Sequence, residues 1–437
     1  MKKLITILFA LLILLPMAGC SKKEEAAEDG KIQIEYLMLN EAGSVDGWMA
    51  MVDEANKQLE ADNIEIVVTK VNATGWPEYY QKAVSLMAGG NSADIGRIAE
   101  SYMPTVIGKG QVKDITGYIN SDFDQSQYYM KTFEGSNYVD GKYYGVPSGL
   151  YNYMLYYNKD LFDEAGIAYP SADWNNPTSF EEIADMAAAL TKDTDSGKQF
   201  GFYTGPYMAE VGMFSTSLGG NNVFDANGNP TMNDATAKQV YAWFDQMLSA
   251  GTMPRPTDTT IMSSFDMFMN GKLAMTIDGT WMLGVMGGIE DFNVGLAAVP
   301  GAANGQAYSS QFVDQFVIYE GCKNPDAAWK AIKALVSQEG FEASSSMNVG
   351  GVPVQKTVAD AFIENQLGGN IDAVSKQAAK DALDHVIKVP YNSYYQEADE
   401  KVNNTMDEWL LGQITSDEFA EKVQQILLDY KAEAEKN

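Results

Sequence analysis

Residues 145–162 read Gly-Val-Pro-Ser-Gly-Leu-Tyr-Asn-Tyr-Met-Leu-Tyr-Tyr-Asn-Lys-Asp-Leu-Phe, and this stretch sets the expected fold. The segment from Leu150 to Tyr157 is rich in aromatic residues, which favour extended strands. A helix is predicted to begin at Asn158. We therefore expect a long extended run that leads directly into a helix.

Strand and helix patterns alternate on both sides of this stretch. Upstream, the pattern of apolar residues predicts strands at 32–39 and 64–68 and a short strand from 94. Helical spacing predicts helices at 46–61 and 79–87. Downstream, the pattern predicts strands at 273–277 and 295–299, a helix at 326–337, and a C-terminus that is helical throughout from about 394 to 430. This alternation implies an α/β layered architecture.

Chain length and net charge limit the number of lobes and the classes of ligand that we expect. A chain of 437 residues is long enough for two lobes, and 46% of its residues are hydrophobic, which is ample for large cores. The formal net charge of -29 disfavours nucleic acids, anionic lipid surfaces and polyanionic ligands, and it leaves room for a cationic ligand.

Few residues are suited to metal or nucleophilic chemistry. His385 is the single histidine, which excludes most histidine-based metal sites and makes a Ser-His-Asp mechanism depend on one residue. Cys322 is expected to be an unpaired, unreactive thiol. The spacings at 193–197 and 225–229 resemble parts of a calcium loop but lack its full pattern, so we interpret them as turns. No metal and no cofactor are predicted.

The N-terminus has the order of a secretory signal. Lys2 and Lys3 precede an apolar run, and Ala18-Gly19 stand directly before Cys20, as in a bacterial lipobox. The run is too short to span a bilayer. We expect residues 1–19 to be removed, Cys20 to carry the lipid, and residues 20–30 to form a lipid-anchored flexible tether.

Several local motifs together resemble family 1 extracellular solute-binding proteins, the maltose-binding type. They occur in order over roughly residues 31–430, at 145–162, 270–281, 298–300, 323–329 and 412–419. The resemblance implies an α/β fold of two lobes, like that of periplasmic binding proteins, with three interlobe crossings near Tyr151, Pro300 and Ala343 and a ligand cleft between the lobes. Lobe one would comprise 31–150 and 301–342, and lobe two 151–300 and 343–437.

The same resemblance implies a function without catalysis. A protein of this family captures a solute outside the cell and delivers it to the permease subunits of an ABC importer. Here a carbohydrate is expected, preferably an oligosaccharide, because seven Trp and 24 Tyr offer plates for sugar rings. We expect a monomer held at the extracellular face of the membrane through Cys20.

The candidate ligand residues come from the loops that the resemblance places at the cleft. Trp281 is the expected stacking residue, with Asp278 as an acceptor for hydroxyl groups, although a tryptophan of structural role and a turn-capping aspartate remain open alternatives. The other candidates, for which solvated loop or packing positions are the alternative, are Asn40, Glu41, Trp76, Arg97, Glu100, Ser101, Tyr151, Tyr207, Glu210, Tyr394 and Tyr395.

Two other functions remain open from the sequence. A binding protein for another solute, such as a polyamine or a peptide, would suit the acidic composition. A secreted glycoside hydrolase would need two opposed carboxylates, and with 59 acidic residues such a pair can arise by chance.

Overall fold

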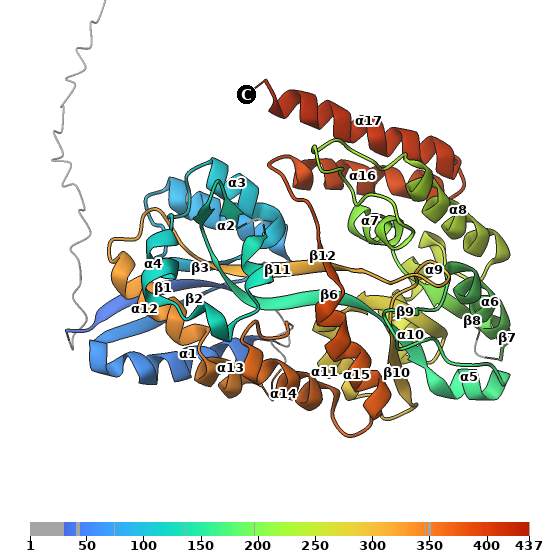
Figure 1. Cartoon of the computed structure of the whole chain (residues 1–437), viewed down its shortest axis with the longest axis horizontal. Helices are drawn as coiled ribbons and strands as arrows, with labels where there is room; N and C mark the ends of the chain where they lie inside the picture. Colours follow the sequence, from blue (N-terminus) through green and yellow to red (C-terminus); the bar gives the residue numbers. More distant parts are fainter. Residues whose placement is uncertain are drawn as a thin grey trace, which may run out of the picture.

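The computed structural model describes residues 30–40, 44–73, 75–135, 137–195, 197–345, 347 and 351–436. The predicted signal segment and Cys20 lie outside these residues, as does Glu41. Two lobes lie side by side along the long axis of the molecule (Figure 1). In the described part of the chain, no helix combines the length and the apolar character that crossing a bilayer requires.

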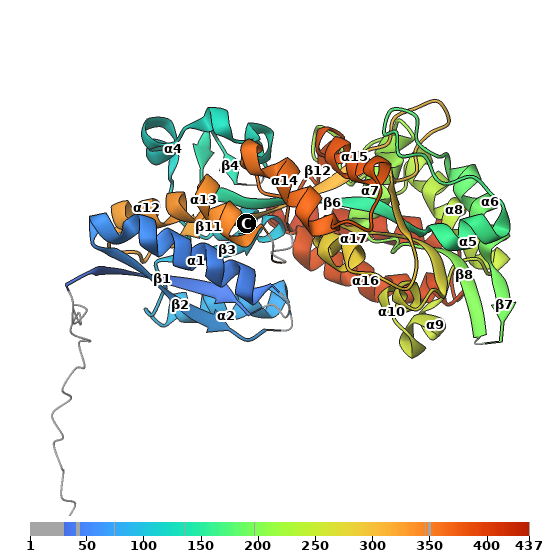
Figure 2. The same cartoon turned by 90° about the horizontal axis from the view of Figure 1, so that it is seen from below.

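Lobe one is a sheet with helices on both faces (Figure 2). Its strand β1 pairs in parallel with β2 and β3. Ile34, Tyr36 and Met38 of β1 enter a hydrophobic cluster with α1 and α12, whereas Leu37 and Leu39 enter a second cluster with α2 and α3. Successive side chains of a strand point to opposite faces, so this apolar run buries both faces of the sheet.

Lobe one contains the predicted strands and helices, whose ends agree with the sequence pattern within a few residues, and further short elements that were not predicted. Their bounds are β1 Ile32–Leu39, α1 Val45–Leu59, β2 Ile64–Val71, α2 Trp76–Ala88, β3 Ile95–Ala99, α3 Met103–Gly108, α4 Thr116–Asp122, β4 Tyr138–Val139, β5 Lys142–Tyr143, α12 Pro325–Leu335 and α13 Gln338–Ser344, with short 3-10 helices at Glu60–Asp62 (η1), Glu100–Tyr102 (η2), Gln125–Gln127 (η3) and Met130–Glu134 (η4).

Most of the stretch 145–162 forms β6 (Val146–Asn158), which belongs to both lobes. Its first half pairs antiparallel with β11 (Ser309–Ile318), which in turn pairs with β3 of lobe one. Its second half pairs antiparallel with β9 and β10 of lobe two. Nearly every residue of β6 is buried, because both faces are covered.

Helix α14 (Lys356–Leu367) also stands between the lobes. Its Val358 and Phe362 join the core of lobe one, whereas Ile363 and Leu367 join that of lobe two. The lobe boundaries at residues 150, 300 and 342 stay predictions. Gly301 hydrogen-bonds to Thr178 of lobe two, which favours a second change of lobe within β11.

Lobe two contains the other end of the sheet and most of the helices. Its bounds are α5 Lys159–Ala165, α6 Phe180–Leu190, β7 Lys192–Thr194, β8 Gly197–Tyr203, α7 Met208–Ser217, α8 Ala235–Ala250, α9 Pro256–Ile261, α10 Ser264–Met269, β9 Leu273–Gly279, η5 Thr280–Met282, α11 Leu283–Gly287, β10 Val294–Ala297, α15 Ala373–Asp381, η6 Ala382–Asp384, β12 Val386–Lys388, α16 Tyr395–Leu410 and α17 Ser416–Ala434.

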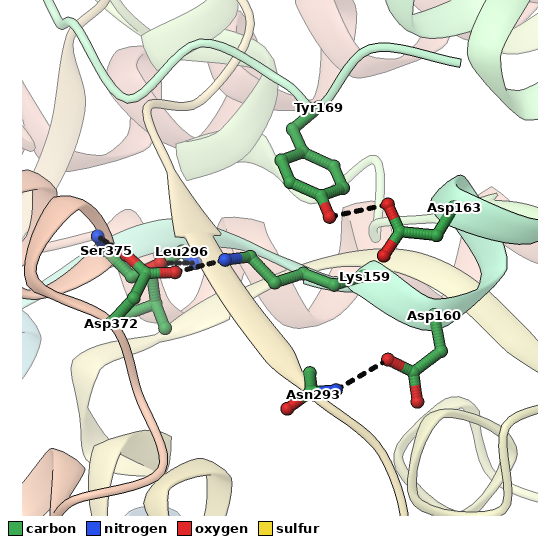
Figure 3. A network of polar contacts seen from close by, with 8 residues as sticks. All are labelled: Lys159, Asp160, Asp163, Tyr169, Asn293, Leu296, Asp372 and Ser375. Carbon is green, nitrogen blue, oxygen red and sulfur yellow. Dashed lines mark hydrogen bonds and ion pairs between the residues drawn. The ribbon is translucent and has the colours of Figure 1, made fainter. Parts of the chain in front are cut away.

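A polar network at the end of β6 fastens α15 to lobe two (Figure 3). The Lys159 ammonium pairs with the Asp372 carboxylate and lies over the Tyr169 ring. The backbone N–H of Leu296 in β10 donates to Ser375 Oγ at 3.0 Å. Burial opposes the charged form of Asp372, yet the hydrogen bonds from Lys159 and from the Ser375 N–H hold its pKa below the ordinary value. Asn158 Oδ1 accepts hydrogen bonds from the N–H groups of Asp160 and Leu161, and Asp160 accepts one from Asn293 at 2.8 Å, so all three residues of the Asn-Lys-Asp motif make structural contacts.

The prediction of one continuous C-terminal helix is wrong. Helix α16 ends at Leu410, and α17 begins at Ser416. Gly412 has φ of 73°, a left-handed conformation that ends helices. The Thr415 side chain accepts a hydrogen bond from the N–H of Glu418, and the Glu418 carboxylate accepts one from the N–H of Thr415, which starts the second helix.

Candidate functional site

A cavity of about 760 Å³ lies where the lobes meet, a size suited to a small-molecule ligand. Lobe one, the interlobe strands β6 and β11, and lobe two all contribute to its wall. The lining residues are Ser44, Trp76, Ala99, Glu100, Ser101, Tyr151, Tyr153, Tyr203, Gly205, Tyr207, Ala209, Glu210, Ser264, Thr276, Ile277, Asp278, Trp281, Phe312, Val313, Asp314, Tyr391, Tyr395, Gln396 and Asp399. We call this cavity the cleft.

Trp281 stands in the middle of an aromatic group on the cleft wall. It belongs to the 3-10 helix η5 that follows β9. Its ring centroid lies 5.8 Å from that of Tyr153 and 6.2 Å from that of Phe312. A Cβ at Gly279 would lie 2.2 Å from the indole, so the glycine makes room for this orientation. The indole is partly exposed within the cleft wall, as a stacking plate must be.

Glu210 is a carboxyl group buried in the lobe-two side of the cleft. It lies in the first turn of α7 and is 5% exposed. Burial raises its pKa to about 8; the hydrogen bond that the Tyr153 hydroxyl donates at 2.8 Å acts against this shift, and the charges of Asp399 and Asp278 add to it. At neutral pH the group is therefore mostly protonated and can donate a hydrogen bond.

Carboxyl groups enter the cleft from several elements. Besides Glu210, they are Glu100, Asp278, Asp314 and Asp399. Burial raises the pKa of Asp399 to about 6, and it also raises the pKa of Asp278. Among the described lining residues there is no lysine or arginine. The described lining thus offers hydroxyl-binding acceptors and aromatic faces, and it contains no cationic side chain.

Most of the predicted site residues lie in the cleft wall, although their role in binding stays a prediction. The predicted residues that line it are Trp76, Glu100, Ser101, Tyr151, Tyr207, Glu210, Asp278, Trp281 and Tyr395.

Three predicted residues do not line the cleft. The Arg97 side chain is 1% exposed and lies behind the wall. Asn40 lies in an exposed position, where its Nδ2 donates to Asn72 Oδ1 at 2.5 Å. The Tyr394 ring packs against Phe224, with centroids 6.1 Å apart. Each of these three side chains makes contacts outside the described lining, and its role in binding stays a prediction.

Sequence reasoning missed several lining residues. Tyr153 lies two positions after Tyr151 on an extended strand, so the period of two placed both on one face. Asp399 lies four positions after Tyr395 on α16, and residues four apart on a helix share one face in the same way. Asp314 had no signal, because it faces the cleft only through the pairing of β11.

The residues that resembled metal or catalytic groups lie elsewhere. In the described ranges, no group of three or more His, Cys, Asp or Glu residues could hold a metal ion. Asp225 accepts hydrogen bonds from the N–H groups of Asn227 and Asn229 at 2.8 Å, as in a turn. Cys322 is buried and free, and burial raises the pKa of its thiol to about 12. The His385 ring stacks on Trp174.

Known protein sequences resemble this chain over most of its length. The family model described as bacterial extracellular solute-binding protein matches residues 50–380. The maltodextrin-binding protein MdxE of Bacillus subtilis is 25% identical over 327 residues, which are 71% of this chain and 70% of that protein. A maltooligosaccharide ABC transporter solute-binding lipoprotein of Streptococcus pneumoniae is 23% identical over 347 residues, 75% of this chain and 74% of that protein.

Solved structures share the fold. An ABC substrate-binding protein from Listeria monocytogenes in complex with cycloalternan has a TM-score of 0.80 at 21% identity, covering 92% of this chain and 99% of that chain. Maltose-bound MalE3 of T. maritima has a TM-score of 0.72 at 18% identity, covering 91% and 99%. The sequence match, the two-lobed α/β fold and the cleft between the lobes lead to one conclusion: this chain belongs to the bacterial extracellular solute-binding protein family.

Proposed function

We propose that this protein captures an extracellular carbohydrate, preferably an oligosaccharide, and delivers it unchanged to the permease of an ABC importer. The observation that supports this proposal is the interlobe cleft, whose wall combines aromatic rings with carboxyl groups. A sugar ring has an apolar C–H face that packs on an aromatic plate, and hydroxyl groups that need hydrogen-bond partners when they are buried. Related proteins named for maltodextrin and maltooligosaccharide support this assignment.

The charged groups of the cleft wall indicate which ligand charge the cleft accepts. Five carboxyl-bearing residues, Glu100, Glu210, Asp278, Asp314 and Asp399, line the cleft, and the described lining contains neither lysine nor arginine. Burying an anionic sugar there would leave its charge without a cationic partner and next to other carboxyl groups. Sugar acids and sugar phosphates should therefore be rejected, whereas neutral sugars are accepted.

A panel of solutes tests the proposal. Purified protein is mixed with maltotriose, mannotriose, a galacturonate trimer, spermidine or a tripeptide, and the melting temperature is measured, since a ligand that binds the folded state raises it. We expect a rise with at least one neutral trisaccharide, followed by calorimetric confirmation and recovery of the intact sugar. If no neutral sugar binds, or if the sugar is hydrolysed, the proposal fails.

A cationic solute such as a polyamine is the second candidate. The acid-rich wall, together with rings such as Trp281 and Tyr153, could also hold an ammonium group through cation–π contacts. A rise with spermidine and none with sugars would favour it.

Attachment to the membrane is proposed at Cys20. In cells that produce the full chain, the Cys20→Ser variant should appear in the culture medium, and wild type should stay with the membrane fraction. Equal distribution of the two proteins would contradict the lipid anchor. We also propose that the protein acts as a monomer, which light scattering of the purified chain will check.

A further inference from the structure

Arg97 is a charged residue in the middle of a buried strand, where a guanidinium needs partners to offset its desolvation. It lies in β3, whose five residues read Ile-Gly-Arg-Ile-Ala. Its Nη1 lies 3.3 Å from the Asp314 carboxylate and 3.4 Å from the Tyr151 hydroxyl. The guanidinium carbon lies 4.1 Å from the ring centroid of Trp48 and 4.9 Å from that of Trp76.

Three of these partners line the cleft, and Arg97 does not. Trp76 comes from α2, Tyr151 from β6 and Asp314 from β11. The last two lie on the strands that pass between the lobes. A guanidinium is planar and presents its donors in a fixed geometry, so one group can hold several neighbours in defined positions.

The depth of Arg97 separates its role from that of a ligand contact. With 1% of its side chain exposed, it lies behind the residues that face the cavity. It pairs with the Asp314 carboxylate, so this acid in the wall has a cationic partner directly behind it. Its face supports the Trp76 indole from behind.

We infer that Arg97 is a positioning residue of the cleft, which holds Trp76, Tyr151 and Asp314 in the arrangement that receives the ligand. This inference rests on the proposed function, because it assumes that the cleft binds the solute. It assigns to Arg97 an indirect role, in place of the direct contact expected from the sequence.

The test combines a structure with a binding cycle. Arg97→Met keeps an aliphatic side chain and removes the guanidinium group. Arg97→Lys keeps the positive charge and removes the planar arrangement of N–H donors. Crystal structures of both variants without ligand should show displaced Trp76 and Tyr151 side chains, with smaller displacements for Arg97→Lys. If Arg97→Met does not fold, the paired variant Arg97→Met with Asp314→Asn removes the unpaired buried charge and replaces it in this experiment.

Calorimetry with maltotriose gives the second measurement. Arg97→Met should weaken binding by about tenfold or more. The change Tyr151→Phe should then weaken binding less in the Arg97→Met background than it does in wild type, because the effects of coupled residues are not additive. Full additivity, or wild-type affinity in Arg97→Met, would overturn the inference. If wild type does not bind maltotriose, the proposed function loses this ligand, and the crystal structures still decide the role of Arg97: unmoved side chains reject it.

Discussion

The two sides of the cleft differ in the side chains they present. Among the described lining residues, lobe one has a single aromatic ring, Trp76, together with polar groups of Ser44, Glu100 and Ser101. The lobe-two side has many rings, among them Trp281, and it holds the carboxyl groups whose pKa values are raised by burial. We expect lobe two to supply most of the apolar contact with the ligand, and lobe one to complete the cleft with polar groups.

This difference has a source in the backbone. On the lobe-two side, β9, η5 and α7 bring Trp281 and Glu210 to the wall. On the lobe-one side, Ser44 directly precedes α1 and Glu100 begins η2 directly after β3. Arg97 then stiffens the lobe-one side from behind. Four predictions test the comparison, from the largest expected effect to the smallest.

The largest effect concerns stability and pH on the lobe-two side. Glu210 binds a proton more tightly in the folded than in the unfolded state, because burial raises its pKa from 4.5 to about 8. As pH rises between these values, wild type should lose up to about 1.4 kcal/mol of unfolding free energy per pH unit relative to Glu210→Gln. Urea unfolding of the two proteins at pH 5, 6, 7 and 8 measures this difference. A difference that does not change with pH would contradict the assignment.

The second effect concerns sugar affinity and compares the two lobes directly. Trp281→Ala should weaken the binding of the sugar selected by the panel tenfold or more, about 1.4 kcal/mol or above, by loss of stacking and buried area. Trp76→Ala should weaken it less. Titration calorimetry measures both, with Trp281→Phe as the control that keeps an aromatic plate. A larger loss in Trp76→Ala would reverse the comparison of the lobes.

The third effect separates stability from binding. Lys159→Met should lower the unfolding free energy by about 1 kcal/mol at most, because the pair with Asp372 is partly exposed. Its sugar affinity should stay within about twofold of wild type, since Lys159 does not line the cleft. Thermal unfolding and calorimetry of the same preparation give both values. A large loss of affinity would connect this network to the cleft.

The smallest effect is expected for Tyr394, a predicted site residue that lies outside the described cleft lining. Tyr394→Phe deletes a hydroxyl outside the cleft wall and should leave affinity within about twofold. The matched change Tyr395→Phe, one residue on, deletes a hydroxyl of a side chain that lines the cleft and should weaken binding more. Equal affinities in the two variants would deny Tyr395 a role.

The fold could be predicted from local patterns to a large extent. The alternation predicted the strand β1, although the structure buries both of its faces from Tyr36 to Leu39, and the helical spacing of Trp48, Met51, Val52, Ala55 and Leu59 corresponds to the buried face of α1. The error at the C-terminus arose because the apolar spacing continues past Gly412, and a left-handed glycine leaves little trace in periodicity. Periodicity reports which face is buried, and it does not report what that face packs against.

Some residues of the candidate site could be predicted from the sequence, and others depend on the packing of distant segments. The family resemblance placed Trp281 and Asp278 at the cleft, and the structure has both in its wall, Asp278 in β9 and Trp281 in η5. Arg97 was expected there too, yet its distance from the cavity depends on the neighbouring strands and on Trp48. Asp314 lines the cleft without any local signal in the sequence, because its position depends on the pairing of β11 with β6 and β3.

The sequence by itself determined the elements, the α/β class and the kind of surface that a ligand would meet, because these follow from residues near one another in the chain. Tertiary structure alone decided which side chains converge and how strongly they are desolvated. Glu210 is an ordinary carboxylate in the sequence, and its pKa rises only because the cleft removes water and places other acids around it.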